Sequence, residues 1–419
     1  MLLRSLLQTA IRQGTVRLID ASDRTFLIGD GQAPVCTLRL KRRHLDWSIA
    51  LNPSIRLAEA YMNGLIVIED GTLYDFLDLM ARNSAKVGLD EHWLKLGTGA
   101  LLRLARRIKR HNPIHRARRN VAHHYDLSEE LYRLFLDEDM QYSCAYFRDP
   151  GISLEQAQLE KKRLLTAKLY IDRPGLKVLD IGSGWGGLGL HLASHAGCDV
   201  TGVTLSVEQH RVSRDKARAA GLDRQVRFDF RDYREIQGSF DRIVSVGMFE
   251  HVGKGNYPEF FDKIRDLLAE DGVCVLHTIG RSNEPGPINP FILKYIFPGS
   301  DVSCLSEVLP VVERAGLLVT DIEVLRLHYA ETLRHWRERF QANRDRIREL
   351  YDERFCRMWE IYLAGTELSF IHQDTVVFQI QFVKHRDAVP LTRDYMALSP
   401  LGTGSTGRAS YPRLVQQAP

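Results

Sequence analysis

The chain has 419 residues, of which 44% are hydrophobic and 26% are charged, a composition typical of a globular protein of two or three domains. No apolar run approaches the roughly 20 residues that a membrane-spanning helix needs. The opening MLLRSLLQTAIRQG is interrupted by Arg4 and Arg12, which does not fit a signal peptide. The six cysteines are scattered without a CxxC pair, which argues against disulfides and structural zinc. We therefore expect a cytoplasmic protein with reduced thiols.

The net charge of +4 is unevenly distributed. Residues 1–120 carry 20 Lys and Arg against 11 Asp and Glu, so the rest of the chain is net negative. Much of the excess lies between Arg103 and Arg119, in RLARRIKRHNPIHRARR, where apolar residues alternate with the basic ones. This segment fits three interpretations, which are a solvated linker helix, a contact with anionic phospholipid headgroups, and a nucleic-acid contact.

The N-terminal part predicts a small α+β domain over residues 1–85. The segments TVRLID, RTFLIG, CTLRLKR and LDWSIAL alternate apolar and polar residues, as strands do. A helix is expected around IRLAEAYMNG, a strand at LIVIED and a second helix at LYDFLDLMAR. Read alone, this domain is weakly similar to sterol-carrier-like lipid-binding modules. We expect it to present lipid and to pair subunits into a homodimer, with residues 86–122 as a basic connector.

Residues 123–395 predict a larger α/β domain. Strand segments KVLDIG, DVTGVTLS, VRFDFRDY, DRIVSVGMF and VCVLHTIG are separated by helical segments, a pattern typical of a doubly wound parallel sheet. VTDIEVLRLHY and TVVFQIQFVK would complete the sheet as an antiparallel pair. A charged helical insert near 331–362 is expected to cover the strand ends. The tail, 396–419, is rich in Gly, Ser, Thr and Pro and is predicted to be disordered.

VLDIGSGWGGLGLHLA places a glycine-rich turn between a strand and a helix, where backbone amides can approach a ligand closely. The strand ends in Asp180, the spacing is DxGxGxGG, and no acidic residue ends the next strand, TGVTLS. The combination resembles motif I of class I S-adenosylmethionine-dependent methyltransferases, and Asp232 and Tyr233 of RDYRE lie where that family contacts adenine. A sulfonium favours aromatic faces and oriented carbonyls over a nearby lysine. HHYDLSEELYRLFLD and DMQYSCAYF are expected to form a lid with Tyr125, Tyr142 and Ser143 turned inward, with ordinary helix packing as the alternative.

Six motifs occur in one order: YSCAYF, LDIGSGWGG, VTLSVEQ, MFEHVG, HTIG and HYAETLRHW. From about residue 115 to 385 they resemble the cyclopropane-fatty-acyl-phospholipid synthase family, which is related to the mycolic acid cyclopropane synthases. The resemblance implies methylene transfer from S-adenosylmethionine to the cis double bond of unsaturated acyl chains in membrane phospholipids. The cofactor-binding positions are then Tyr125, Tyr142, Ser143, Asp180, Gly182, Gly184, Thr204, Gln209, Asp232 and Tyr233.

The same resemblance implies that a carbocation is deprotonated by a bound bicarbonate. Its holders would be Cys144, Glu250, His277, Ile279 and Tyr329. An anion beside Glu250 requires a shared proton, which a raised glutamate pKa would permit. Relatives carry a cysteine, often labelled catalytic, where IYLAGTELSF places Thr366, so a cysteine nucleophile is impossible at that position. We interpret Cys144 as part of the cavity wall, contributing through its backbone and shape.

Two other activities stay open. The cation could lose a proton elsewhere and give a methylene-branched chain, or the basic segment could serve a nucleic-acid methyltransferase. The second is disfavoured because INPF follows the fifth strand and not the fourth, so it is no Asn-Pro-Pro-Tyr box; we predict no nucleic-acid partner. HLASH lacks the glutamate of HExxH, so His191 and His195 predict no metal site. NEPGPINPFILKYIFPG fits either an acyl-chain entrance or an ordinary loop. The expected location is the inner face of an anionic membrane, with the protein peripherally bound.

Overall fold

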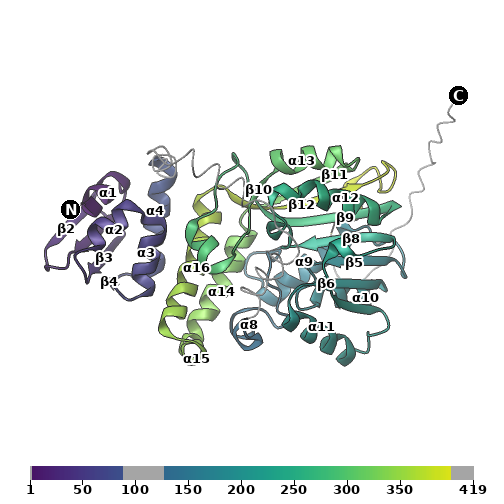
Figure 1. Ribbon diagram of the computed structural model, residues 1–419, viewed down its shortest axis with the longest axis horizontal. Coiled ribbons are helices and arrows are strands. Elements are labelled where there is room, and N and C mark those ends of the chain that lie inside the picture. The colour runs from purple at the N-terminus through teal and green to yellow at the C-terminus, as the bar shows by residue number, and fades with distance from the viewer. Residues whose placement is uncertain (1, 88–126, 398–419) are drawn as a thin grey trace.

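The computed structural model describes residues 2–87 and 127–397, with side chains described to residue 83 and from residue 127 onward. These residues form a small N-terminal module and a larger module built on a twisted central sheet (Figure 1). The basic connector, apart from its first two residues, lies outside the described residues. Nearly all of the predicted tail and the candidate Tyr125 also lie outside them.

The N-terminal module is a four-stranded sheet in the order β2-β1-β3-β4 with four helices. β1 pairs antiparallel with β2 and parallel with β3, and β3 pairs antiparallel with β4. Val16, Leu18 and Leu38 from the strands are buried in its core. The element bounds are α1 (Leu2–Ala10), β1 (Thr15–Ile19), β2 (Thr25–Gly29), β3 (Val35–Leu40), α2 (Leu45–Leu51), α3 (Pro53–Met62), β4 (Ile66–Asp70) and α4 (Leu73–Val87).

One expected strand of this module is wrong. The segment LDWSIAL is helix α2, and helix α1 was not anticipated. Leu45, Ile49 and Ala50 are buried while Trp47 is exposed, which is the spacing of a helical face. In seven residues the period-two and helical patterns overlap, so alternation alone could not separate them.

The larger module contains the predicted doubly wound sheet, in the order β11-β12-β9-β8-β5-β6-β7. The strands β5 to β9 run parallel, and β12 pairs antiparallel with both β9 and β11, which confirms the expected antiparallel finish. A two-residue strand, β10, also pairs with β9. The strands are β5 (Lys177–Ile181), β6 (Asp199–Thr204), β7 (Val226–Phe230), β8 (Phe240–Val246), β9 (Leu268–Arg281), β10 (Ser303–Cys304), β11 (Leu318–Leu325) and β12 (Thr375–Val383).

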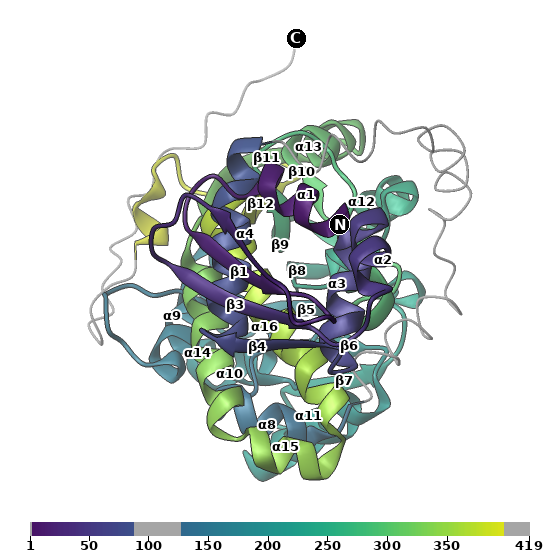
Figure 2. The ribbon, with the colours of Figure 1, turned by 90° about the vertical axis from the view of Figure 1, so that its left-hand side faces the viewer.

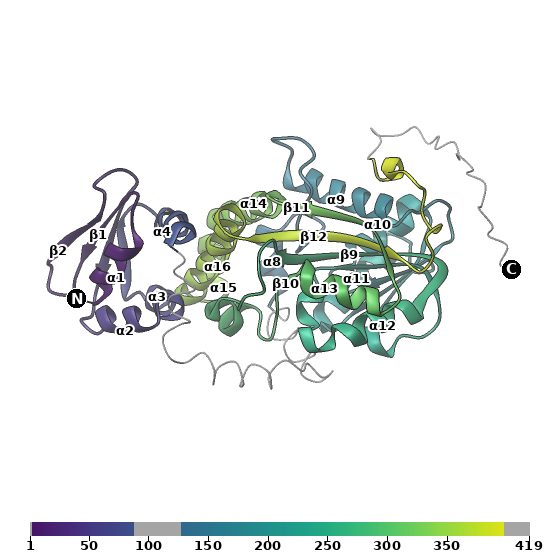
Figure 3. The ribbon, with the colours of Figure 1, turned by 90° about the horizontal axis from the view of Figure 1, so that it is seen from above.

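Helices cover both faces of this sheet (Figure 3). They are α8 (Glu129–Phe135), α9 (Leu154–Lys168), α10 (Gly187–Ala196), α11 (Val207–Ala219), α12 (Tyr257–Leu267) and α13 (Leu305–Arg314). Within residues 2–87 and 127–397, no helix combines the length and the apolar character needed to cross a membrane.

Three helices between β11 and β12 correspond to the predicted charged insert: α14 (His328–Ala342), α15 (Arg344–Leu350) and α16 (Glu353–His372). α16 lies between the two modules and packs against α3 and α4 (Figures 1 and 3). Viewed from the N-terminal end, the small sheet and its helices lie in front of α16 and of the end of the large sheet (Figure 2). The insert therefore separates the small module from the edge of the sheet where the parallel strands end.

Candidate active site

The glycine-rich turn connects β5 to α10 and shapes the first part of the site. Gly182 has a φ of +83°, which favours glycine, and a Cβ placed there would lie 2.7 Å from the Cβ of Met248. Gly186, also with positive φ, is the N-cap of α10. The turn thus lies at the start of a helix, where backbone amides can approach a ligand closely.

A cavity of about 140 Å³ lies beside this turn. It is lined from the ends of β5, β6, β7 and β8 and from the DMQYSCAYF segment. All nine predicted cofactor-binding residues within the described part of the chain line it: Tyr142, Ser143, Asp180, Gly182, Gly184, Thr204, Gln209, Asp232 and Tyr233.

Buried polar atoms in this cavity fit a polar ligand. Asp180 is 2% exposed, and its Oδ2 has no hydrogen-bond partner among the described residues. Burial raises the pKa of this carboxyl to about 7. The Ser183 hydroxyl and the Trp185 indole N–H beside it are likewise buried without partners. A ligand with an ammonium and a carboxylate, such as the amino-acid end of S-adenosylmethionine, would satisfy these groups.

Lys161 on α9 also lines the cavity, contrary to the expectation of a site without a lysine. It is fully buried, and its Nζ donates to the Gln141 Oε1 at 2.7 Å and to the Ser143 Oγ at 2.9 Å. Burial lowers its pKa to about 8, partly offset by Asp137. The signal in the sequence was a lysine on the otherwise mostly apolar stripe of α9 that includes Leu154, Ala157, Leu164 and Leu165.

The opposite end of the cavity carries the predicted adenine contacts. Arg234 holds the Asp232 carboxylate through Nε to Oδ1 at 2.9 Å and through Nη2 to Oδ2 at 2.8 Å. Burial raises the pKa of Tyr233. Thr204 donates from its hydroxyl to the Gln209 Oε1 at 2.9 Å. Asp232 and Thr204 are thus held in place by neighbouring side chains.

A second cavity, of about 480 Å³, adjoins the first. Tyr142, Ser143, Gly247 and His251 line both, so the two cavities meet at these residues. The second is also lined by all five predicted catalytic residues, Cys144, Glu250, His277, Ile279 and Tyr329.

Glu250 lines this cavity and has one carboxylate oxygen with a hydrogen-bond partner. Its Oε1 accepts the Ile279 backbone N–H at 2.6 Å, while its buried Oε2 has no partner among the described residues. Burial raises the pKa of Glu250 to about 7. The Ile279 N–H, the predicted backbone donor to bicarbonate, is therefore already used by Glu250.

His277 lies on β9 in the same wall. Burial lowers its pKa to about 3, so the ring is neutral at physiological pH. The amide of Gln379 donates to its Nδ1 at 3.0 Å, which leaves the ring proton on Nε2. His277 is therefore a hydrogen-bond donor in this arrangement and not a proton acceptor.

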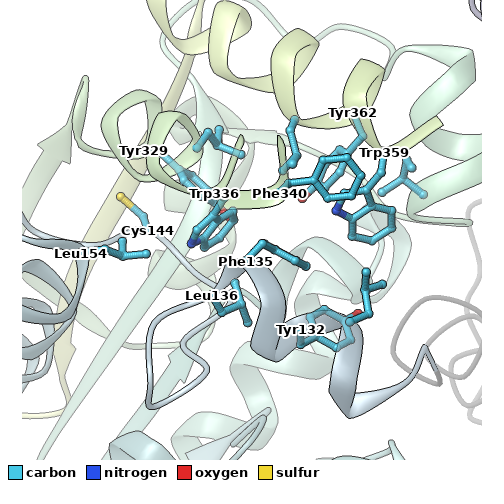
Figure 4. Close-up of a cluster of buried hydrophobic side chains, with 14 of the residues drawn as sticks. Tyr132, Phe135, Leu136, Cys144, Leu154, Tyr329, Trp336, Phe340, Trp359 and Tyr362 are labelled. Atoms are coloured by element: carbon cyan, nitrogen blue, oxygen red, sulfur yellow. The ribbon is translucent and has the colours of Figure 1, made fainter. Parts of the chain in front are cut away.

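An aromatic cluster joins the predicted lid to the helical insert, with Phe135 of the lid against Trp336 and Trp359 (Figure 4). Tyr142 packs on Trp336 with ring centroids 5.1 Å apart, and its hydroxyl lies 2.7 Å from that of Tyr362. Tyr329 meets Trp336 edge-on at 5.8 Å. Tyr142 and Ser143, for which the sequence predicts an inward orientation, line both cavities.

Cys144 lies in the same cluster and is fully buried (Figure 4). Burial raises the pKa of its thiol, and its Sγ donates to the carbonyl of Ala145 at 3.3 Å. The neighbouring Ala145 N–H donates to the Thr332 hydroxyl at 3.0 Å, which ties the lid to α14. A buried neutral thiol is a poor nucleophile, and Cys144 lines the larger cavity.

The fold is that of a class I S-adenosylmethionine-dependent methyltransferase. It is defined by the strand order, by the antiparallel β12 and by the glycine-rich turn after β5. A coclaurine N-methyltransferase shares this fold, with a TM-score of 0.65 at 22% identity, and covers 79% of this chain and 99% of its own. The chain belongs to the mycolic acid cyclopropane synthetase family, whose model matches residues 112–380.

Relatives agree with this assignment. The chain is 37% identical to the cyclopropane-fatty-acyl-phospholipid synthase of Escherichia coli, over 84% of this chain and 89% of that protein. It is 40% identical to a probable fatty acid methyltransferase of Pseudomonas putida, over 66% and 73%. A cyclopropane synthase structure from Mycobacterium tuberculosis superposes with a TM-score of 0.62 at 31% identity, covering 65% of this chain and 98% of its own. The protein is an S-adenosylmethionine-dependent methyltransferase.

Proposed function

We propose that the enzyme transfers a methylene group from S-adenosylmethionine to the cis double bond of unsaturated acyl chains in membrane phospholipids and forms a cyclopropane ring. The observation that carries this proposal is the meeting of the cofactor cavity and the larger cavity at Tyr142, Ser143, Gly247 and His251. A cofactor-bound methyl group and an acyl chain could approach each other there. The larger cavity is mostly apolar, as an acyl chain requires.

The aromatic wall suits this chemistry. S-adenosylmethionine supplies an electrophilic methyl group, and addition of that group to an alkene leaves positive charge on the chain. The rings of Tyr142 and Tyr329, which line the larger cavity, can stabilise a cation without adding to it, and their packing on Trp336 excludes the water that would capture it. Ring closure then releases one proton from the transferred methyl group.

The proton acceptor is proposed to be bicarbonate held in the second cavity. Bicarbonate is a small, weak base. Glu250, with a raised pKa and a free Oε2, can share a proton with such an anion, and the His277 Nε2–H can donate to it. Tyr329 lines the same wall, as do Cys144 and Ile279. Removing carbon dioxide and bicarbonate from the assay should slow turnover, and an unchanged rate would overturn this assignment.

A second candidate is fatty-acyl methyl transfer that ends in a methylene-branched chain. It is favoured by the 40% identity to two fatty-acid-modifying relatives, the Pseudomonas putida protein and a tuberculostearic acid methyltransferase of Mycobacterium tuberculosis. Cyclopropane formation is preferred because the Escherichia coli synthase matches over a larger share of both chains.

One experiment separates these products. Purified protein is incubated with labelled S-adenosylmethionine and vesicles of unsaturated phospholipid, and the acyl products are identified by gas chromatography and mass spectrometry. Both products gain one carbon, but only the branched alkene is reduced by mild hydrogenation. A label that stays out of the lipid would refute both candidates.

We further propose peripheral binding to anionic membrane and a homodimer paired through the N-terminal module. The charge excess of residues 1–120 supports the first, at up to about 1 kcal/mol per basic residue near the surface. The fraction of protein that sediments with anionic vesicles should fall at high salt. A fraction that does not depend on salt would contradict electrostatic binding to the membrane surface. A monomer by light scattering would remove the dimer.

A further inference from the structure

The larger cavity does not end in the catalytic module. Its lining continues past α16 into the N-terminal module, where residues of α1, β3, α3, β4 and α4 contribute. Among these are Leu38, Leu57, Ile68, Phe76, Leu77 and Met80. One hollow therefore joins the interior of the small module to the residues proposed for catalysis.

The walls inside the small module are almost entirely apolar, with Ser54 and Tyr61 as the polar members of the described lining. Leu57, Leu77 and Met80 pack against the core but remain only partly buried. A hydrophobic hollow without polar partners binds water poorly and favours an apolar ligand.

The catalytic module contributes polar residues to the lining as well. Among them are Arg281, Asn289 and Gln373. Arg281 ends β9, and its Nη2 donates to the Pro287 carbonyl at 2.8 Å. Ester and phosphate oxygens require such donors, whereas a terminal alkyl segment requires none. The polar residues of the lining thus suit the ester and phosphate oxygens of an acyl lipid, and the apolar walls of the small module suit its methyl end.

α16 separates the two parts of the cavity and presents small residues to it. Gly365, Thr366 and Ser369 all line the hollow. A Cβ at Gly365 would have no atom within 4 Å, so the space beside this helix is open. Thr366, at the position where relatives carry a cysteine, is thus a lining residue of the passage.

From these observations we propose that the N-terminal module binds the methyl-terminal segment of the substrate acyl chain, so that it selects for chain length beyond the double bond. This inference rests on the proposed function, because it takes the acyl lipid as the occupant. The deeper the chain extends past Gly365, the more its affinity depends on the small module.

Leu77→Trp tests the inference by filling the hollow from α4. The matched control is Leu27→Trp, on β2 of the same module, where the side chain is 67% exposed and does not line the cavity. Substrates are phospholipid vesicles whose acyl chains share the double-bond position counted from the carboxyl and differ in length beyond it. Thermal melting and S-adenosylmethionine binding check that each variant is folded.

We expect Leu77→Trp to lower the ratio of long-chain to short-chain turnover roughly tenfold for every two methylenes displaced. Leu27→Trp should keep the wild-type ratio. Gly365→Leu provides a second test, because Leu is a better helix former than Gly and should not impair folding. It should shift the same ratio by narrowing the passage.

The outcomes are distinguishable. If wild-type enzyme converts none of the lipids, the proposed function fails. Suppose instead that wild-type enzyme converts the series, and that Leu77→Trp and Gly365→Leu leave the ratio of long-chain to short-chain turnover unchanged or lower turnover equally for all chain lengths. The small module then does not hold the acyl chain, and the inference is overturned.

Discussion

Replacing Glu250 by Gln should lower activity and raise stability at the same time. In the structure the Glu250 Oε1 accepts the Ile279 N–H at 2.6 Å, and the buried Oε2 has no partner among the described residues. Gln has nearly the same shape, and its carbonyl oxygen can keep the bond to Ile279. Its amide nitrogen cannot carry a negative charge or take up a proton.

The stability gain follows from the pKa. Burial raises the pKa of Glu250 from 4.5 to about 7, which corresponds to about 3 kcal/mol of cost for the ionised form. Because the folded pKa lies above the unfolded one, this cost is absent below about pH 4.5, grows as the pH rises, and levels off above about pH 7. The Gln variant should therefore unfold at a higher temperature than wild type at about pH 8 and at the same temperature near pH 4.5.

The activity loss follows because Gln at position 250 cannot take part in proton transfer as Glu250 can. A positioned group that accepts or shares a proton contributes roughly 10²- to 10⁴-fold to a rate, so Glu250→Gln should lose that much turnover. Wild-type kcat should fall as the pH rises through about 7, because ionised Glu250 would repel the bicarbonate anion, and the variant's residual rate should lack this fall. Turnover is measured with labelled S-adenosylmethionine and unsaturated vesicles, and S-adenosylmethionine binding is measured separately. Glu313→Gln, at an exposed position of α13, is the matched control.

Two results would refute this reasoning. Unchanged turnover would remove Glu250 from proton transfer. A variant that is less stable than wild type at about pH 8 would show that the carboxylate is compensated in the folded protein, contrary to the raised pKa.

Three other predictions concern the cofactor cavity and its lid. Cys144→Ala should keep most activity, because the thiol is buried and protonated and is therefore a poor nucleophile, and a dead variant would contradict the wall role. S-adenosylmethionine binding, measured by calorimetry, should tighten as pH rises through about 7, because Asp180 must ionise to pair with the ammonium group; Asp180→Asn should abolish this dependence. Lys161→Met should weaken S-adenosylmethionine binding by about 1.5–3 kcal/mol while the protein stays folded, and unchanged affinity would remove Lys161 from the site.

Much of the catalytic module was predictable because its motifs follow strand ends. In a parallel sheet these ends meet at one edge, so Asp180 near the end of β5, Thr204 at the end of β6 and Asp232 after β7 had to lie close together. Glu250 after β8 and His277 on β9 follow the same rule. The family resemblance indicated which of these residues bind the cofactor and which are catalytic. The sheet explains why their positions lie around two adjoining cavities.

Other features depend on packing between distant segments. Lys161 is far from the glycine-rich turn in sequence, and only the burial of α9 turns its ammonium toward Ser143. The cavity in the N-terminal module depends on which apolar residues are not fully covered. Leu77 and Phe76 have the same apolar character in the sequence, yet one is partly buried and the other is in the core.

The contact between the modules is more polar than stability alone would favour. The Tyr61 hydroxyl donates to Glu360 at 3.0 Å, and the Tyr74 hydroxyl donates to Glu367 at 2.9 Å, both carboxylates being on α16 and buried. His372, at the end of α16, lies 2.7 Å from Asp78 of α4. The free energy needed to desolvate such groups offsets much of the free energy gained by pairing them. An apolar interface between the modules would therefore be at least as stable. Polar pairs, however, allow fewer alternative registers than apolar contacts do. A cavity continuous across α16 requires α3 and α4 to sit in one register, and we infer that these pairs set it.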